Sequence, residues 1–242
     1  MVGWKADKHD IIERFWCIMS MYLYETHLHT AEASLCSGIS GKEQARAYKK
    51  AGYTGIVVTD HFFNGNTSIP DNLPWEERVN LFYKGYENAK REGDKIGLSV
   101  FFAWESNYGG TESLIYGLGK DFLLNNSDYL SWSVKEQYEK VKEAGGYVIH
   151  AHPFRIRSYI KEIRLFPEYT DAVEIVNIGN AKKEYDDQAR EYAEKHNFPG
   201  IAGTDSHGYE EKRTGIAFNY KIRDNSDLIE GIKSRDFKII PY

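Results

Sequence analysis

Short apolar runs and amphipathic helical segments alternate along this chain of 242 residues. Apolar runs typical of buried strands occupy 22–28, 55–59, 98–104, 114–118, 147–152, 172–177, 201–205, 216–220 and 238–240. Helical patterns lie between them at about 41–51, 75–92, 131–144, 181–197 and 226–234. Strands that alternate with helices at this spacing predict parallel βα units. We therefore expect one α/β domain over residues 21–242, because βα barrels of this length form a single unit.

The first 20 residues stand apart from this pattern. They lack the continuous apolar core and the small-residue cleavage site of a signal peptide. Met21 comes directly before the first apolar run, so we expect it to be the true start of the protein. Residues 1–20 are therefore predicted to form an extension that contributes little to the fold.

Six of the eight histidines fall in four short clusters at or near the ends of apolar runs. These clusters are Thr26-His27-Leu28-His29-Thr30, Thr59-Asp60-His61, His150-Ala151-His152-Pro153 and Gly203-Thr204-Asp205-Ser206-His207. Side chains two positions apart on a strand point to the same face, which pairs the imidazoles of His27 and His29. Imidazole and carboxylate are ligands that zinc, iron and manganese share. The pattern predicts one multinuclear metal centre at the C-terminal ends of the strands, where βα barrels build their active sites, and therefore a hydrolase.

Composition narrows the class of protein. The net charge of −5 and the pI near 5.9 argue against a binding face for long nucleic acid, which usually needs a basic stripe. No run of about 18 apolar residues occurs, so no membrane span is expected. Cys17 and Cys36 form no CxxC pattern and no disulfide framework, which fits a cytoplasmic protein. Cys36 lies close in sequence to the first histidine pair, and a metal-ligand role and a buried free thiol are its two interpretations.

Five motifs in this order resemble the PHP family, named after polymerase and histidinol phosphatase domains. They are Thr26-His27-Leu28-His29-Thr30, Thr59-Asp60-His61, Glu105, Ala151-His152-Pro153 and Asp205-Ser206-His207. The resemblance covers about residues 22–220 and implies a distorted seven-stranded (β/α) barrel. It also implies two or three zinc, manganese or iron ions and hydrolysis of phosphoesters. The implied metal ligands are His27, His29, His61, Glu105, His152, Asp205 and His207.

Two departures from the family pattern concern further ligands. Many members have another ligand shortly after the first histidine pair, where this chain offers Glu32. Many also have a histidine in the strand after Glu105, where Glu112 could replace it. If neither carboxylate binds, a two-metal site remains. Asp60 is expected to orient an imidazole rather than to bind metal, and we assign it a catalytic role of that kind.

The remaining expectations concern substrate. Arg155, just after His152-Pro153, is expected to bind the non-bridging oxygens of a phosphate, with Arg157 as a weaker candidate. Asn177 and Asn180 could bind substrate or form ordinary turns, and His150 is expected to support the centre or the core. The aromatic side chains that could stack on a substrate ring are Phe62, Phe63, Trp104, Tyr108 and Tyr159.

The function predicted from these residues is hydrolysis of a small phosphorylated metabolite or nucleotide by a metal-bridged hydroxide. Two alternatives remain open at this point. One is hydrolysis of a non-phosphate bond, since the same metal-bound water would attack an amide or a lactone. The other is a domain that binds metal without turnover.

Overall fold

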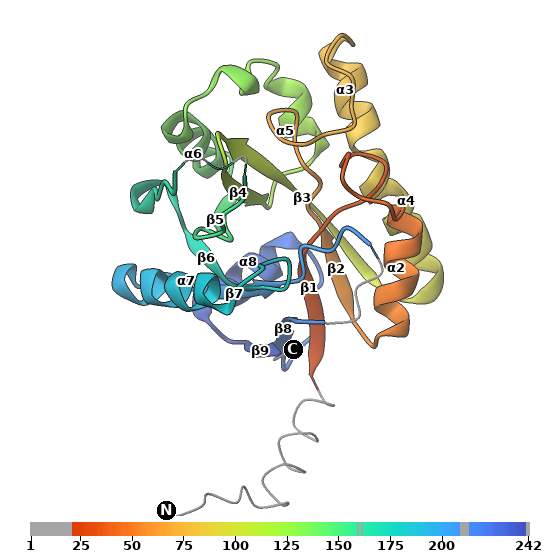
Figure 1. Ribbon diagram of the computed structural model, residues 1–242. Helices are drawn as coiled ribbons and strands as arrows, with labels where there is room; N and C mark the ends of the chain where they lie inside the picture. The colour runs from red at the N-terminus through yellow and green to blue at the C-terminus, as the bar shows by residue number, and fades with distance from the viewer. Residues whose placement is uncertain (1–20, 159, 161, 209–212, 241–242) are drawn as a thin grey trace, which may run out of the picture.

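The computed structural model describes residues 21–158, 160, 162–208 and 213–240 (Figure 1). The extension 1–20 and its predicted minor role lie outside these residues, as does Tyr159. The strands are β1 (Tyr22–Leu28), β2 (Gly55–Val58), β3 (Ser99–Tyr108), β4 (Thr111–Tyr116), β5 (Tyr147–Ala151), β6 (Ala172–Asn177), β7 (Gly200–Gly203), β8 (Gly215–Phe218) and β9 (Lys238–Ile240). The helices are α2 (Gly41–Lys50), α3 (Trp75–Phe82), α4 (Lys84–Ile96), α5 (Lys120–Asn125), α6 (Val134–Glu143), α7 (Lys183–His196) and α8 (Asn225–Ser234), with 3-10 turns at Tyr129–Ser131 and Pro167–Tyr169.

All described strands belong to one sheet with the order β7-β6-β5-β4-β3-β2-β1-β8-β9. Strands β1 to β7 curve until the end of β7 meets the end of β1. There the Asp205 amide donates to the His27 carbonyl at 2.7 Å, and the His29 amide donates to the Ser206 carbonyl at 2.9 Å. The sheet is thus a nearly closed, distorted barrel of seven strands, as predicted, while β8 and β9 extend it as an antiparallel ribbon beside β1.

Strand β4 corrects the expectation of parallel βα units throughout, because it runs antiparallel to both β3 and β5. Gly109 and Gly110 make the turn from β3 to β4 at φ 65° and 96°, a region that favours glycine. The first residues of β4 therefore lie at the same end of the barrel as the last residues of β3 and β5. This reversal brings Glu112 to that end.

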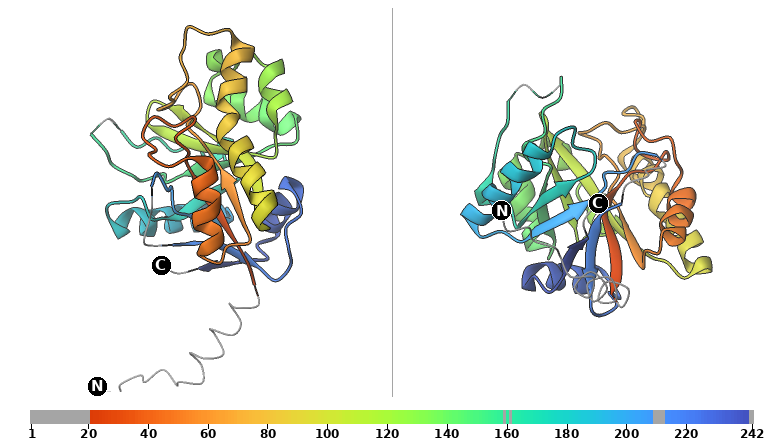
Figure 2. Two further views of the ribbon diagram at one scale, coloured as in Figure 1. Left: turned by 90° about the vertical axis from the view of Figure 1, so that its right-hand side faces the viewer. Right: turned by 60° about the horizontal axis from the view of Figure 1, so that its bottom comes forward.

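Helices cover the outside of the barrel. Helices α2 and α4 pack together on one side, and α7 lies on the opposite side against β6 (Figures 1 and 2). The single helix predicted over 75–92 is divided into α3 and α4, with Tyr83 between them. The first turn of α4 approaches the end of β1 so closely that a Cβ on Gly85 would lie 2.1 Å from Thr30 Oγ1. No helix of the described residues is both long and apolar enough to cross a membrane.

Apolar side chains divide into an interior and an outer layer. Inside the barrel lie Tyr24, Phe101, Leu114 and Ile149, all buried in one cluster that α8 closes at the end opposite the ligand residues. Outside, an aromatic cluster packs between the sheet and α3, α5 and α6. The polar residues described next lie at the end of the barrel where the strands carrying them finish.

Candidate metal centre

The innermost group of the centre joins the end of β1 to the segment after β7. His27 and His29 are completely buried, and their Nε2 atoms lie 3.2 Å apart. Asp205 Oδ1 lies 3.4 Å from the first of these nitrogens and 3.0 Å from the second. The three side chains offer donor atoms within 4.8 Å of one another, a spacing that one metal ion can bridge.

A second group is built around Glu105, which β3 carries near its end. Glu105 Oε1 lies 3.3 Å from His27 Nε2 and 3.1 Å from His152 Nε2, and Oε2 lies 2.7 Å from His61 Nδ1. Glu112 joins from β4, with Oε2 at 3.5 Å from His152 Nε2. Glu105 therefore connects both groups, as a bridging carboxylate would.

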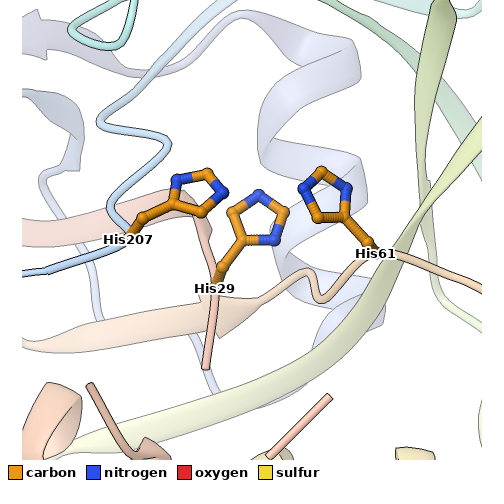
Figure 3. A group of neighbouring side chains, drawn as sticks. All are labelled: His29, His61 and His207. Atoms are coloured by element: carbon orange, nitrogen blue, oxygen red, sulfur yellow. The ribbon is translucent and has the colours of Figure 1, made fainter. Parts of the chain in front are cut away.

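A third group contains the imidazoles of His29, His61 and His207, which converge from three segments (Figure 3). Ring centroids are 4.2 Å apart for His29 and His61 and for His29 and His207. The Nδ1–H of His207 faces the Asp205 carbonyl at 2.8 Å, so Nε2 is left with its lone pair. The centre thus brings together every predicted ligand: His27, His29, His61, Glu105, Glu112, His152, Asp205 and His207.

The donor set fits divalent cations. Several donor atoms of the centre lie close together with few hydrogen atoms between them. The Nε2 atoms of His27 and His29, for example, lie 3.2 Å apart. The buried atoms His61 Nδ1 and Glu105 Oε2 form no hydrogen bond of acceptable geometry, although they lie 2.7 Å apart. Buried polar atoms normally have a partner, and a metal ion satisfies such a group of inward-facing donors.

Glu174 of β6 supports the centre, although no sequence pattern singled it out. Its Oε1 lies 3.0 Å from His27 Nδ1, while Oε2 accepts from the His152 amide at 3.0 Å and from Asn177 Nδ2 at 2.7 Å. A carboxylate on Nδ1 fixes the tautomer that leaves Nε2 free for metal. The one available signal was a glutamate inside the apolar run Ala172–Asn177.

Ser34 was likewise missed, and it corrects the role expected of Asp60. The described hydrogen bonds of Asp60 run to Thr30 N, Thr30 Oγ1 and Ser34 Oγ rather than to an imidazole. Ser34 Oγ in turn lies 3.0 Å from His29 Nδ1 and accepts from the His61 amide at 3.0 Å. Asp60 therefore acts on His29 through Ser34.

Backbone conformation separates His150 from His152. Strand alternation would place both side chains on the same face, but β5 ends at Ala151 and His152 has φ 27°. That turn points His152 toward Glu105, whereas His150 packs edge-on against Tyr192 of α7. Burial lowers the pKa of His150 to about 3, which makes it a neutral core residue. Asp205 also has a positive φ, 54°, at the point where it turns toward the centre.

Arg155 is buried beside the centre, and its side chain donates hydrogen bonds to three other side chains. Nη1 donates to Asp205 Oδ2 at 2.6 Å, Nη2 to Asn177 Oδ1 at 2.6 Å and Nε to Asn180 Oδ1 at 2.9 Å. A guanidinium has five N–H groups, so one on each terminal nitrogen remains for a ligand. The two asparagines thus fix Arg155, and Arg155 orients Asp205.

Charges are strongly coupled in the centre. Burial by itself would raise the pKa of Glu105, but the imidazoles of His27 and His61 hold it well below its usual value. His27 and Arg155 do the same for the pKa of Asp205 against its burial. Burial and the charge of Glu105 raise the pKa of Glu112. Burial and the neighbouring imidazoles of His207 and His61 hold the pKa of His29 well below its usual value, as suits a neutral ligand.

A cavity of about 720 Å³ opens above these residues, and most of the residues that line it are polar or charged. Its lining residues are Cys36, His61, Asn64, Gly65, Asn66, Asn107, Glu112, Arg155, Arg157, Gly179, Asp205 and His207. Glu32 stays outside the centre, since its carboxylate accepts from Gly41 N and Asn88 Nδ2, both at 2.9 Å. Arg157 lies at the wall and donates from Nη2 to the Gly179 carbonyl.

Of the aromatic residues expected to stack on a substrate ring, the four that the structure describes do not line this cavity. Phe62 and Trp104 are completely buried in the outer aromatic cluster, and Phe63 packs against it. The Tyr108 hydroxyl is also buried. Trp104 precedes Glu105 on β3, and neighbouring strand residues point to opposite faces, so the two cannot both face the centre.

Cys36 corrects another expectation, because its side chain is exposed at the cavity rather than buried as a free thiol. Partial burial by itself would raise the pKa of the thiol, but the neighbouring imidazoles of His207 and His61 lower it to about 6.

Comparisons with known proteins agree with this architecture. A family model described as PHP-associated matches residues 183–237. No curated protein matches the chain. The fold is similar to that of a two-domain protein from Bacteroides vulgatus containing a predicted PHP-like metal-dependent phosphoesterase, at 13% identity over 91% of this chain and 64% of that one, with a TM-score of 0.66. The chain therefore spans less than two thirds of the Bacteroides protein.

Two further solved structures share the fold. PsfC from Pseudomonas syringae is 15% identical over 91% of each chain, with a TM-score of 0.59. An amidohydrolase from Chromobacterium violaceum, solved with bound sulfate and no metal, is 11% identical over 90% of this chain and 97% of that one, with a TM-score of 0.57. The family match over residues 183–237 and the shared fold agree with the resemblance to the PHP family that the five motifs carry.

Proposed function

We propose that this protein is a metal-dependent phosphoesterase that hydrolyses a small phosphorylated metabolite or nucleotide. The observation that carries the proposal is the convergence of eight imidazole and carboxylate side chains beneath one polar cavity. Bound divalent ions, with zinc, manganese and iron as the candidates, would supply an activated water and neutralise phosphate charge. Two ions would use His27, His29, His61, Glu105, Glu112, His152 and Asp205, and a third would use His207 together with the neighbouring His29 and His61.

Charge explains why the metals would be needed for binding as well as for chemistry. Glu105, Glu112, Asp205 and Arg155 together carry about −2, which repels a phosphate dianion, whereas two divalent ions would change this to about +2. The chain's own contribution would be to hold the non-bridging oxygens. The remaining N–H groups of Arg155 and the guanidinium of Arg157 suit this role, because both line the cavity.

The residues that line the cavity also narrow the range of suitable substrates. The asparagines Asn64, Asn66 and Asn107 supply amide donors and acceptors, whereas Phe62, Phe63 and Trp104 pack in the aromatic cluster outside the barrel. A small polar phosphoester suits this wall better than a base that needs stacking. With a net charge of −5, no long nucleic acid partner is proposed. A cytoplasmic location remains part of the proposal.

The second candidate function is hydrolysis of a non-phosphate bond. Two observations favour its inclusion: three N–H groups of Arg155 are already used within the protein, and a protein of similar fold is described as an amidohydrolase. The same metal-bound water would attack an amide or a lactone.

The test is product release from two substrate panels, small phosphomonoesters and small amides or lactones. Each panel is run with protein loaded with manganese, zinc or iron and with chelated protein. Metal-dependent phosphate release supports the phosphoesterase. Metal-dependent amide or lactone hydrolysis without phosphate release replaces it with the second function. No turnover from protein shown to hold metal refutes both and leaves a binding domain.

A further inference from the structure

Asn107 connects the two strands that carry Glu105 and Glu112. It lies directly opposite Glu112 in the antiparallel pairing of β3 and β4, so the two side chains share one face of the sheet. Glu105 lies two residues before Asn107 on β3 and therefore points to the same face. Asn107 is thus the next side chain beyond these two carboxylates, and it lines the cavity above them.

The side-chain amide of Asn107 holds one oxygen of Glu112. Its Nδ2 donates to Glu112 Oε1 at 2.7 Å, whereas Glu112 Oε2 lies 3.5 Å from His152 Nε2. Glu112 is buried, and a buried oxygen without a partner is costly. One oxygen of this carboxylate therefore has a protein partner, and the other is directed at the donor atoms of the centre.

The orientation of the Asn107 amide is fixed from its other end. Its Oδ1 accepts from the Gly110 amide at 3.0 Å, within the turn that the two glycines make. A rotated amide would place its oxygen against Glu112 Oε1 and its NH₂ group against the Gly110 N–H. The backbone is held as well, because Asn107 N donates to Asn64 Oδ1 at 3.2 Å. Asn107 therefore presents an N–H group, and not its oxygen, to Glu112.

This contact determines how Glu112 can bind an ion. A carboxylate binds a metal through one oxygen or through both. We propose that Asn107 is a positioning residue that makes Glu112 a one-oxygen metal ligand, because it occupies Oε1 and leaves Oε2 to the centre. Binding through one oxygen would leave a coordination position for water or substrate, as metal sites that act on substrates require. The inference rests on the metal site of the proposed function but not on the reaction.

The experiment measures the zinc affinity of the full chain by chelator competition, with zinc alone as the ligand. Asn107→Leu keeps the approximate size of the side chain and removes the N–H donor. We expect it to weaken the binding of one zinc ion by about 10–100-fold, the range typical for loss of a residue that orients a metal ligand. Asn66→Leu is the matched control, because Asn66 is exposed on the wall of the same cavity, and it should bind zinc as the wild type does.

A second measurement repeats Asn107→Leu in a Glu112→Ala background. If Asn107 acts through Glu112, the substitution should change the affinity for the remaining zinc by less than about twofold, because the contact is already lost. A further tenfold loss in this background would show a general structural role and overturn the proposal. Wild-type affinity in folded Asn107→Leu would overturn it as well.

Asn107→Ser replaces the leucine variant if that variant does not fold. The serine hydroxyl can still accept from the Gly110 amide, as serine does in turns, but it is too short to reach Glu112. The same losses are expected, and the same two results would refute the role of Asn107. Neither measurement needs turnover. Wild-type protein that binds zinc but releases no phosphate would therefore refute the proposed reaction alone, whereas wild-type protein that binds no metal would refute both.

Discussion

Replacing Glu174 by glutamine tests whether the residues behind the ligands control the metal. In the native protein Oε1 faces His27 Nδ1, and Oε2 accepts two N–H groups, from the His152 backbone and from Asn177. Glutamine has the same shape but only one oxygen. The Asn177 amide cannot easily turn to compensate, because its own oxygen accepts from Arg155 at 2.6 Å.

The glutamine amide therefore has two possible orientations, and each has an energetic cost. With its oxygen toward His27, its NH₂ group meets two N–H donors, and each unsatisfied buried group costs about 1–3 kcal/mol. With its oxygen toward those donors, its NH₂ group donates to His27 Nδ1, and the imidazole proton moves to Nε2, which faces the metal. The second arrangement costs less within the protein but blocks a ligand atom. We expect metal affinity to fall by about 10–100-fold, or about 1.4–2.7 kcal/mol.

The assay is metal affinity by chelator competition for Glu174→Gln, with metal content measured by mass spectrometry. Glu191→Gln, which removes the same charge from an exposed position of α7, is the control. Circular dichroism establishes that both variants are folded. An affinity of folded Glu174→Gln within twofold of wild type would refute the tautomer argument.

Three further predictions concern the ligands themselves. His29→Ala or Asp205→Ala should lower metal content and reduce turnover to background, because both residues face the innermost group; full activity in either would contradict the assignment. Arg155→Ala should raise KM for a phosphoester. It should also weaken metal binding, because the buried Asp205 carboxylate loses its partner, and breaking a buried ion pair typically lowers the free energy of unfolding by about 3–5 kcal/mol. An unchanged metal content would mean that Arg155 does not orient Asp205. Glu112→Ala should remove one metal equivalent while Glu112→His retains it, and equal metal contents in the two variants would exclude Glu112 as a ligand.

The strands were largely predictable from the sequence, because buried apolar runs end at clear breaks. The direction of β4 was not predictable in this way, because an apolar run does not show whether a helix or a tight two-glycine turn connects it to the preceding strand. Gly109-Gly110 was visible between the runs, and its turn geometry was the missed signal. The division of the helix predicted over 75–92 into α3 and α4 was also missed, because its apolar pattern continues across Tyr83.

The candidate ligands were found because histidine and aspartate cluster at the ends of the apolar runs and because the motifs resemble those of the PHP family. The supporting residues were not, since Glu174 and Ser34 act through contacts between distant segments. For the aromatic residues, the sequence predicted a place at the pocket that the structure does not give them. Sequence proximity to Glu105 suggested that Trp104 lines the pocket, whereas strand alternation sends it into the core. Whether the predicted ligands bind metal remains a prediction for the experiments above.

The junction of β1 and β7 gives the metal centre a mechanical role. Two backbone hydrogen bonds between the strand ends, from Asp205 N to His27 O and from His29 N to Ser206 O, join the barrel here. Ligands from both strand ends meet at the same place, so an ion held by His27, His29 and Asp205 would hold the ends of β1 and β7 together. Loss of metal and loosening of the barrel would then be one event. The free energy of unfolding of this protein should accordingly depend on the concentration of free metal.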